Sequence, residues 1–176
     1  MDMHDQILTA AALVAALQLA ACSIDVQKHN GGRNADVDIR APGGAVSVRT
    51  AVPADGTGLA VYPNARPSRE HGRDESADVD IDTAWFGVKV VAAKYESDDD
   101  PEKVLAFYRG EMANYAPYVE CRGRVRWHRS ERPSCREGTS SEVKLVAGVE
   151  HRQRVVSVKP HHGGTEFALV YVATSD

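Results

Sequence analysis

Apolar and polar residues alternate in two stretches of the chain that resemble each other. Residues 35–48 read ADVDIRAPGGAVSV, and residues 77–90 read ADVDIDTAWFGVKV. In both, Val and Ile alternate with charged residues, a break follows, and the pattern Val-x-Val resumes. A period of two is typical of a strand with one apolar face, so each stretch predicts a β-hairpin. Either the hairpins pair with each other or they take similar positions on one sheet; a chance likeness between two simple strand sequences is the alternative.

One helix is predicted after the second hairpin, over residues 100–115. Asp100 suits the N-cap, and Pro101 suits the first helical position. The acidic side chains around them lie at the positive end of the helix dipole. Apolar residues then recur at helical spacing and form a stripe, bordered by Phe107, that consists of Val104, Leu105, Tyr108 and Met112. We expect this stripe to pack against a sheet, and it has no pattern typical of a cofactor site.

Further strands are predicted after the helix. They are the segments 117–121, 124–128, 142–148, 153–159 and 165–173. The residues His161-His162-Gly163-Gly164 predict a turn between the last two. Together with the hairpins, these segments predict a mainly antiparallel β-sheet with one principal helix packed on it, which is an α+β fold. The last strand, EFALVYVAT, is apolar enough to lie at the centre of the sheet.

The chain has 176 residues, of which 43% are hydrophobic and 26% are charged. These values are typical of a globular protein with one domain, or with one domain and a small appendage. We divide the chain into a signal segment at 1–21, a β-hairpin segment with a linker at 22–58, and an α+β domain at 59–176, in which 64–76 form a charged surface loop. The formal net charge of −4 argues against nucleic acid as a partner.

The apolar run ILTAAALVAALQLAA occupies residues 7–21. Crossing a bilayer takes roughly 20 apolar residues, so this run is short for a membrane span. Its length and the small residues at its end are typical of a secretory signal peptide. The first five residues carry two Asp and no Lys or Arg, unlike the positively charged start of most signal peptides. The alternative is a buried helix with an incidental cysteine after it.

The end of this run, Leu19-Ala20-Ala21-Cys22, resembles the lipobox of bacterial lipoproteins. The resemblance implies a diacylglycerol thioether on Cys22, removal of residues 1–21 and acylation of the new N-terminus. Several acyl chains anchor a protein stably, at about 0.8 kcal/mol per buried CH₂. In Gram-negative lipoproteins an Asp after the cysteine favours retention at the inner membrane, whereas this chain has Ser23. The resemblance therefore implies a lipid anchor at the periplasmic face of the outer membrane.

Two further resemblances concern the rest of the chain. Residues 59–174 resemble a group of bacterial secreted α+β proteins without a known activity. The motifs that carry this resemblance are Val61-Tyr62-Pro63, the segments 95–99 and 101–108, Cys121, and the segment 164–172. The first hairpin resembles the short strand repeats of bacterial adhesin domains of the toast-rack type. Neither resemblance implies a substrate or a cofactor.

Cysteine pairing follows from the anchor. If Cys22 carries lipid, Cys121 and Cys135 are left as a pair in an oxidising compartment, which predicts a disulfide. The alternative is a zinc site, because His128 lies midway between these two cysteines, although a fourth ligand is not evident. The sequence has no Walker A, GxGxxG, HExxH or GxSxG motif, so we expect no metal, no cofactor and no catalytic residue.

Charge is segregated along the chain. Residues 121–137 contain six Arg and two Glu, a local charge of +4, whereas 74–102 contain ten acidic residues and two Lys, a local charge of −8. In one interpretation the arginines lie in a solvated loop and pair with the acidic segment. In the other they bind an anionic lipid or glycan of the envelope through charge-assisted hydrogen bonds, and the candidate residues are Arg122, Arg124, Arg126 and Arg129.

Three classes of function are consistent with these observations. The leading hypothesis is a membrane-anchored, non-enzymatic envelope lipoprotein that acts as a binding or interaction module. The second is an enzyme or accessory subunit that acts on an envelope polymer, for which a deep pocket with convergent polar groups would be evidence. The third is a structural protein that assembles through exposed strand edges. The sequence identifies no protein partner.

Overall fold

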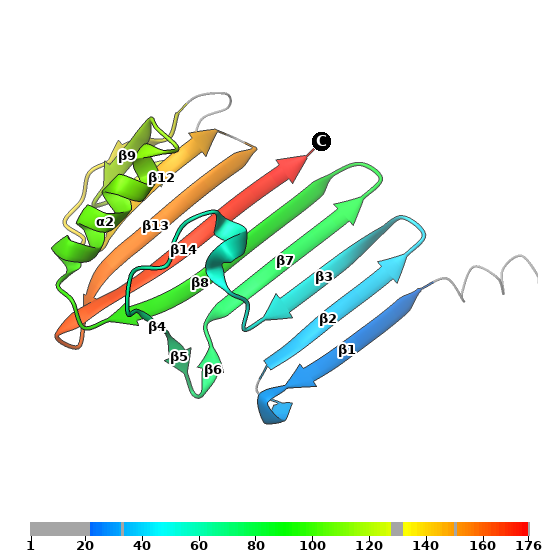
Figure 1. Ribbon diagram of the computed structural model, residues 1–176. Coiled ribbons are helices and arrows are strands. Elements are labelled where there is room, and N and C mark those ends of the chain that lie inside the picture. The colour runs from blue at the N-terminus through cyan, green and yellow to red at the C-terminus, as the bar shows by residue number, and fades with distance from the viewer. Residues whose placement is uncertain (1–21, 33, 128–131, 150, 176) are drawn as a thin grey trace, which may run out of the picture.

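The computed structural model describes residues 22–32, 34–127, 132–149 and 151–175. The signal segment 1–21, and with it the lipobox residues before Cys22, lies outside the described residues, as do His128 and Arg129. Nine strands form one antiparallel path in the order β1-β2-β3-β7-β8-β14-β13-β12-β9, and β4 pairs with β8 as the tenth strand of this sheet. One α-helix of the described residues, α2, lies at one side of the sheet (Figure 1). The predicted α+β class is therefore confirmed.

Both predicted hairpins form. The first consists of β2 (Asn34–Ala41) and β3 (Gly44–Thr50), and the second of β7 (Ser76–Thr83) and β8 (Gly87–Ser97). Strand β3 pairs with β7, so the two hairpins pair with each other. The chain also has a strand that we did not predict, β1 (Ser23–His29), which pairs with β2 and is followed by the 3-10 turn η1 (Asn30–Gly32). The alternation of Ile24 and Val26 with the polar residues Ser23, Asp25 and Gln27 is the sequence signal for it.

The strands after the helix lie close to their predicted positions. They are β9 (Tyr118–Cys121), β10 (Arg124–Arg126), β12 (Val143–Val149), β13 (Arg152–His161) and β14 (Gly164–Ser175). A short strand that we did not predict, β11 (Ser134–Arg136), pairs with β10 in a separate two-stranded sheet. Strand β14 lies between β8 and β13, which confirms that the last strand is central.

Helix α2 (Pro101–Ala113) covers part of one face of the sheet. The Asp100 carboxylate accepts a hydrogen bond of 2.8 Å from the backbone N–H of Glu102, which confirms the predicted N-cap. The predicted apolar stripe is buried, and it packs against side chains of the strands β8, β12, β13 and β14. The largest of the strand side chains in this core are Tyr95, Val143, Leu145, Val156, Val158, Phe167 and Leu169. The packing of α2 on the sheet thus forms the hydrophobic core cluster.

The segment between the two hairpins is ordered against this core. Residues Ala54–Thr57 form the 3-10 turn η2, and Ala54 is only 1% exposed. The predicted charged loop contains three two-residue strands, β4 (Arg66–Pro67), β5 (Arg69–Glu70) and β6 (Arg73–Asp74). Strand β4 adds to the edge of β8 at Tyr95 and Glu96, and β5 pairs with β6.

Among the described residues, no layer covers the first strands of the sheet. We call β1, β2, β3 and β7 the open half, and β8, β14, β13, β12 and β9 with α2 the covered half (Figure 1). Across the open half and β8, Val and Ile side chains lie opposite one another on one face in two rows. One row is Val26, Val37, Val48, Val79 and Val90, and the other is Ile24, Ile39, Val46, Ile81 and Val88.

The other face of the open half is acidic. It continues the face that α2 covers, and it carries Asp36, Asp38, Asp78 and Asp80. The Lys89 ammonium lies 3.2 Å from a carboxylate oxygen of Asp78 and 3.2 Å from one of Asp80. Among the described residues, no helix has both the length and the apolar character needed to cross a membrane.

Candidate functional site

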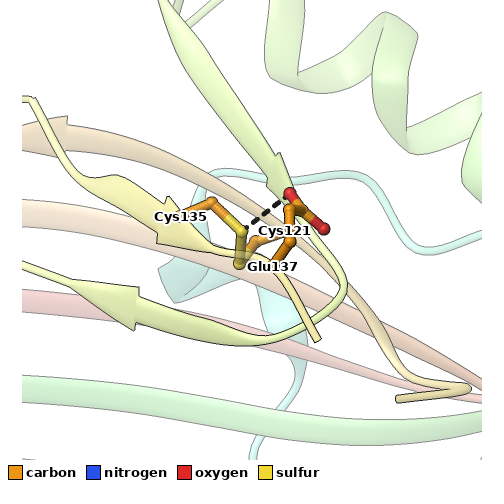
Figure 2. Close-up of side chains that lie close together, drawn as sticks. All are labelled: Cys121, Cys135 and Glu137. Atoms are coloured by element: carbon orange, nitrogen blue, oxygen red, sulfur yellow. Dashed lines mark hydrogen bonds between the residues drawn. A yellow bond between two sulfur atoms is a disulfide. The ribbon is translucent and has the colours of Figure 1, made fainter. Parts of the chain in front are cut away.

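A disulfide joins the edge of the covered half to the β10–β11 hairpin. Cys121, at the end of β9, bonds to Cys135 of β11 with a Cα–Cα distance of 5.4 Å, which confirms the predicted bridge (Figure 2). Glu137 Oε1 lies 3.0 Å from Cys135 Sγ. These three residues are close enough to share a metal ion, but a bridged sulfur is not a thiolate and binds zinc poorly. The structure therefore favours the disulfide over the zinc alternative.

The disulfide orients the arginines of β10. Val125 lies opposite Cys135 in the two-stranded sheet and is half-buried on the side of the bridge. Because successive side chains of a strand point to opposite faces, Arg124 and Arg126 are placed together on the other, exposed face. Arg136 lies directly opposite Arg124 on this face. Two like charges in this position repel each other, so an anion between them would relieve the repulsion.

The arginines are only partly neutralised by the acidic segment. Arg122 Nη2 lies 3.6 Å from Glu102 Oε1, which is the one contact of this kind between the two segments among the described residues. Within those residues, Arg124, Arg126 and Arg136 form no ion pair. The acidic segment is instead neutralised by cations close to it, through the pairs Lys89–Asp78, Lys89–Asp80, Lys94–Glu75, Arg66–Asp98 and Lys103–Asp99.

A shallow depression of about 550 Å³ lies beside these arginines. Its charged lining residues are Arg122, Arg124 and Lys144, and no carboxylate of the described part of the chain lines it. Glycine backbone forms part of its wall, because a Cβ at Gly123 would overlap the carbonyl oxygen of Arg136. Lys144, which is paired with Glu142 at 3.0 Å, was missed from the sequence, since only the β9–β12 register places it opposite Cys121. A guanidinium-rich recess without acids suits a phosphate-type anion, which guanidinium groups bind in a bidentate manner.

A second cluster of polar groups is more enclosed. The Lys94 ammonium lies 2.6 Å from Glu75 and 3.7 Å from Glu166, and the Ser68 hydroxyl donates a hydrogen bond of 2.6 Å to Glu75. A recess of about 280 Å³ beside it is lined in part by Glu75 and Lys94. The hydrogen bond from Lys94 holds the pKa of Glu75 below its usual range, and Glu75 raises the pKa of Lys94. Both groups are therefore held charged, whereas acid–base catalysis needs a pKa near the working pH.

The candidate anchor lies far from the candidate anion site. Cys22 is exposed and directly precedes β1, the strand at one edge of the sheet. The arginines directly follow β9, the strand at the other edge, and the Cys121–Cys135 bridge ties the end of β9 to their β10–β11 hairpin. Eight strand spacings separate β1 from β9, which amounts to roughly 38 Å at about 4.8 Å per spacing. Of the predicted residues, the structure thus groups Arg122, Arg124 and Arg126, and it separates them from Cys22.

Comparisons of this chain with models of known protein families, with curated protein sequences and with solved structures find no match.

Proposed function

We propose that this chain is a non-enzymatic lipoprotein of the bacterial envelope that binds a phosphate-bearing ligand. The anchor is a lipid on Cys22 at the periplasmic face of the outer membrane, as the lipobox-like residues before it imply. The ligand site is the depression lined by Arg122, Arg124 and Lys144, with Arg126 and Arg136 beside it. The two sites lie at opposite edges of one sheet, so the same chain can be attached at one edge and bind at the other.

The observation that carries this proposal is the arginine pair Arg124–Arg136. The two residues lie directly opposite each other, without a carboxylate among the described residues to separate their charges. Exposed ion pairs contribute only about 0–1 kcal/mol each, so neutralising these arginines within the protein would stabilise the fold little. A phosphate that accepts hydrogen bonds from several guanidinium groups gains much more from the same arrangement. Its affinity should fall as salt rises, because the Debye length shortens to about 8 Å at physiological ionic strength.

The ligand phosphate can belong to a lipid headgroup or to a glycan, and one experiment distinguishes these sources. Full-length Cys22→Ser protein is mixed at low salt with anionic phospholipid vesicles, with lipopolysaccharide, or with a soluble phosphorylated glycan released from it. Binding to vesicles alone identifies a headgroup, and binding to the soluble glycan identifies the sugar phosphate. No binding to any of the three at low salt would contradict the proposal.

Variants test whether the depression is responsible. Arg124→Ser with Arg126→Ser should weaken binding at least tenfold and leave the melting temperature nearly unchanged, since both side chains are exposed. Lys28→Ser with Arg49→Ser is the matched control, because it removes the same charge from exposed positions of the open half. Equal losses in the two double variants would indicate attraction by overall charge instead of a site.

The anchor is tested separately. Cys22→Ser should move the protein from the membrane fraction to the soluble fraction, and Ser23→Ala should leave it in the membrane fraction. Intact mass of the mature protein should show residues 1–21 removed and acyl chains added. A mature mass without an acyl addition would contradict the anchor whatever the outcome of the binding assay.

Assembly through strand edges is a second candidate function, and β1 is the observation that favours it. The outer edge of β1 is unpaired in the described sheet, and its side chains Ile24 and Val26 are 71% and 52% exposed. An apolar strand at an open edge is a template for pairing with another chain. If this is the function, Cys22→Ser protein should form dimers or longer assemblies in light scattering, and Val26→Lys should abolish them. A monomer at every concentration measured would rule this candidate out.

A further inference from the structure

The most exposed aromatic residues of the described chain lie at the tip of the β7–β8 hairpin. Trp85 is 78% exposed and Phe86 is 49% exposed. The turn that presents them is ordered by hydrogen bonds, because the Thr83 hydroxyl donates to the Phe86 carbonyl at 2.7 Å and accepts from the Phe86 N–H at 3.0 Å. The Thr83 N–H donates to the same carbonyl at 3.0 Å. These hydrogen bonds therefore order the turn that holds both rings at the surface.

This tip lies at the same end of the sheet as Cys22. Starting from Ser23, the first residue of β1, the register runs through Arg40, Ala45 and Asp82 to Gly87. Figure 1 shows the start of β1, the β2–β3 turn and the β7–β8 turn at one end of the sheet. Three strand spacings separate β1 from β7, which is roughly 14 Å at about 4.8 Å per spacing. The tip and the candidate lipid attachment point are thus close neighbours.

The connection between the anchor and the sheet is very short. Strand β1 begins at Ser23, the residue directly after Cys22. One extended residue spans at most about 3.6 Å, so lipid on Cys22 would hold this end of the sheet at the headgroups. A Trp ring prefers this zone of the bilayer, because its apolar body is buried there while its N–H keeps a polar partner. Arg40 of the same row can meet headgroup phosphates, and Asp82 opposes this attraction.

We infer that the Trp85–Phe86 tip inserts into the bilayer that holds the Cys22 lipid and forms a second membrane contact. This inference rests on the proposed lipid anchor. Two membrane contacts about 14 Å apart restrict the tilt of the sheet relative to the bilayer, whereas a lipid on Cys22 alone would leave this tilt free. The strands then rise away from the bilayer. Lys144, which lines the arginine depression, is at the level of Lys94 in the strand register. Lys94 lies seven residues along β8 from Gly87, so the depression is about 24 Å from the anchored end of the sheet, at about 3.4 Å per residue.

Fluorescence of Trp85 tests the inference, because the chain has only two Trp. Trp127→Phe leaves Trp85 as the single reporter in the mature, lipidated protein. After reconstitution into phospholipid vesicles, its emission should shift to shorter wavelength than in soluble Cys22→Ser,Trp127→Phe protein. It should also be quenched by brominated acyl chains and be protected from aqueous iodide. Trp85→Ser, which leaves Trp127 of the far edge as the reporter, should show none of these changes.

The outcomes separate this inference from the anchor. If the purified protein carries acyl chains but Trp85 emits as it does in water and is open to iodide, the tip does not insert and the inference is overturned, while the anchor stands. If Trp85 becomes buried at high protein concentration without vesicles, the tip contacts a second copy and the inference is likewise overturned. If the mature mass shows no acyl chain, the anchor and the inference fail together.

Discussion

The covered half and the open half belong to one hydrogen-bonded sheet, yet the same face of that sheet is apolar in one and acidic in the other. In the covered half this face carries side chains such as Leu145 and Leu169, both 0% exposed beneath α2. In the open half it carries the aspartates of β2 and β7. Strand β8 contains the change: Ala93 lies in the core, and Lys89, four residues earlier, binds Asp78 and Asp80.

This difference teaches that continuous strand pairing does not mean uniform stability. A backbone hydrogen bond contributes only about 0.5–1.5 kcal/mol net, because water satisfies the same groups in the unfolded chain. Fully burying a large apolar side chain contributes about 1.5–3 kcal/mol. The covered half has both contributions, whereas the open half depends on strand pairing and on contacts within the Val and Ile rows. The open half should therefore open first in local unfolding.

The largest expected effect comes from a core aromatic of the covered half. Phe167 is 1% exposed, and its ring centre lies 5.6 Å from that of Tyr95 and 5.5 Å from that of Tyr108. Phe167→Ala should lower the free energy of unfolding by about 3–5 kcal/mol, because it leaves a cavity among these rings. The matched control, Phe86→Ala, should change it by under about 0.5 kcal/mol, since the ring lies at the surface. Urea denaturation measures the free energy of unfolding of both variants. Similar losses in the two would contradict the division of the sheet into a covered and an open half.

The next effect concerns the bridge at the outer edge of the covered half. Cys121 and Cys135 are 14 residues apart in the sequence. Replacing both by Ala should cost about 3 kcal/mol, because the unfolded chain is no longer constrained by this loop. Thermal unfolding of the double variant, and of the wild-type protein with and without reductant, measures this effect. If neither the double substitution nor the reductant changes the melting temperature, the bridge does not form in solution.

A smaller effect is expected from the Glu75–Lys94 pair, which lies on the face of the sheet opposite to α2. The pKa of Glu75 is held low by Lys94, so its stabilisation is present above the unfolded pKa, about 4.3, and is lost as pH falls through the lower folded pKa. Glu75→Gln should cost about 1–2 kcal/mol at pH 7 and less as the pH is lowered below 4. Glu70→Gln, at a side chain that is 70% exposed, is the control and should change neither value. Urea unfolding between pH 3 and pH 7 tests this. If Glu75→Gln lowers the free energy of unfolding equally at pH 3 and at pH 7, the Glu75–Lys94 pair is not the cause of the loss.

The smallest effect should come from the Val row of the open half. Val48→Ala should cost about 0.5 kcal/mol, whereas Val158→Ala, at a position that is 1% exposed, should cost about 2 kcal/mol or more. Native-state hydrogen exchange sharpens the comparison, because amides of β2 should exchange by openings that leave β13 and β14 protected. Equal protection of the two halves would mean that an additional contact covers the open half in solution.

Local signals in the sequence predicted most of the elements, and their misses have physical causes. Asp100 and Pro101 placed the helix start correctly, because capping depends on neighbouring residues only. The disulfide followed from counting cysteines. Strand β11 was missed since three residues carry too little periodicity to be recognised, and it exists because it pairs with β10. Lys144 was missed as a lining residue because its position beside the arginines depends on the β9–β12 register.

The two copies of ADVDI separate what sequence and tertiary structure decide. Period-two alternation by itself determined that both copies are strands, and which of their side chains share a face, because that pattern is a property of the extended backbone. It did not determine what lies above each face. The copy in β7 pairs with β8 next to the core, and the copy in β2 lies two strands further out, where no helix of the described residues covers it. Only the tertiary structure decided this, because α2 packs over β12, β13 and β14, and such long-range packing leaves no mark on a five-residue pattern.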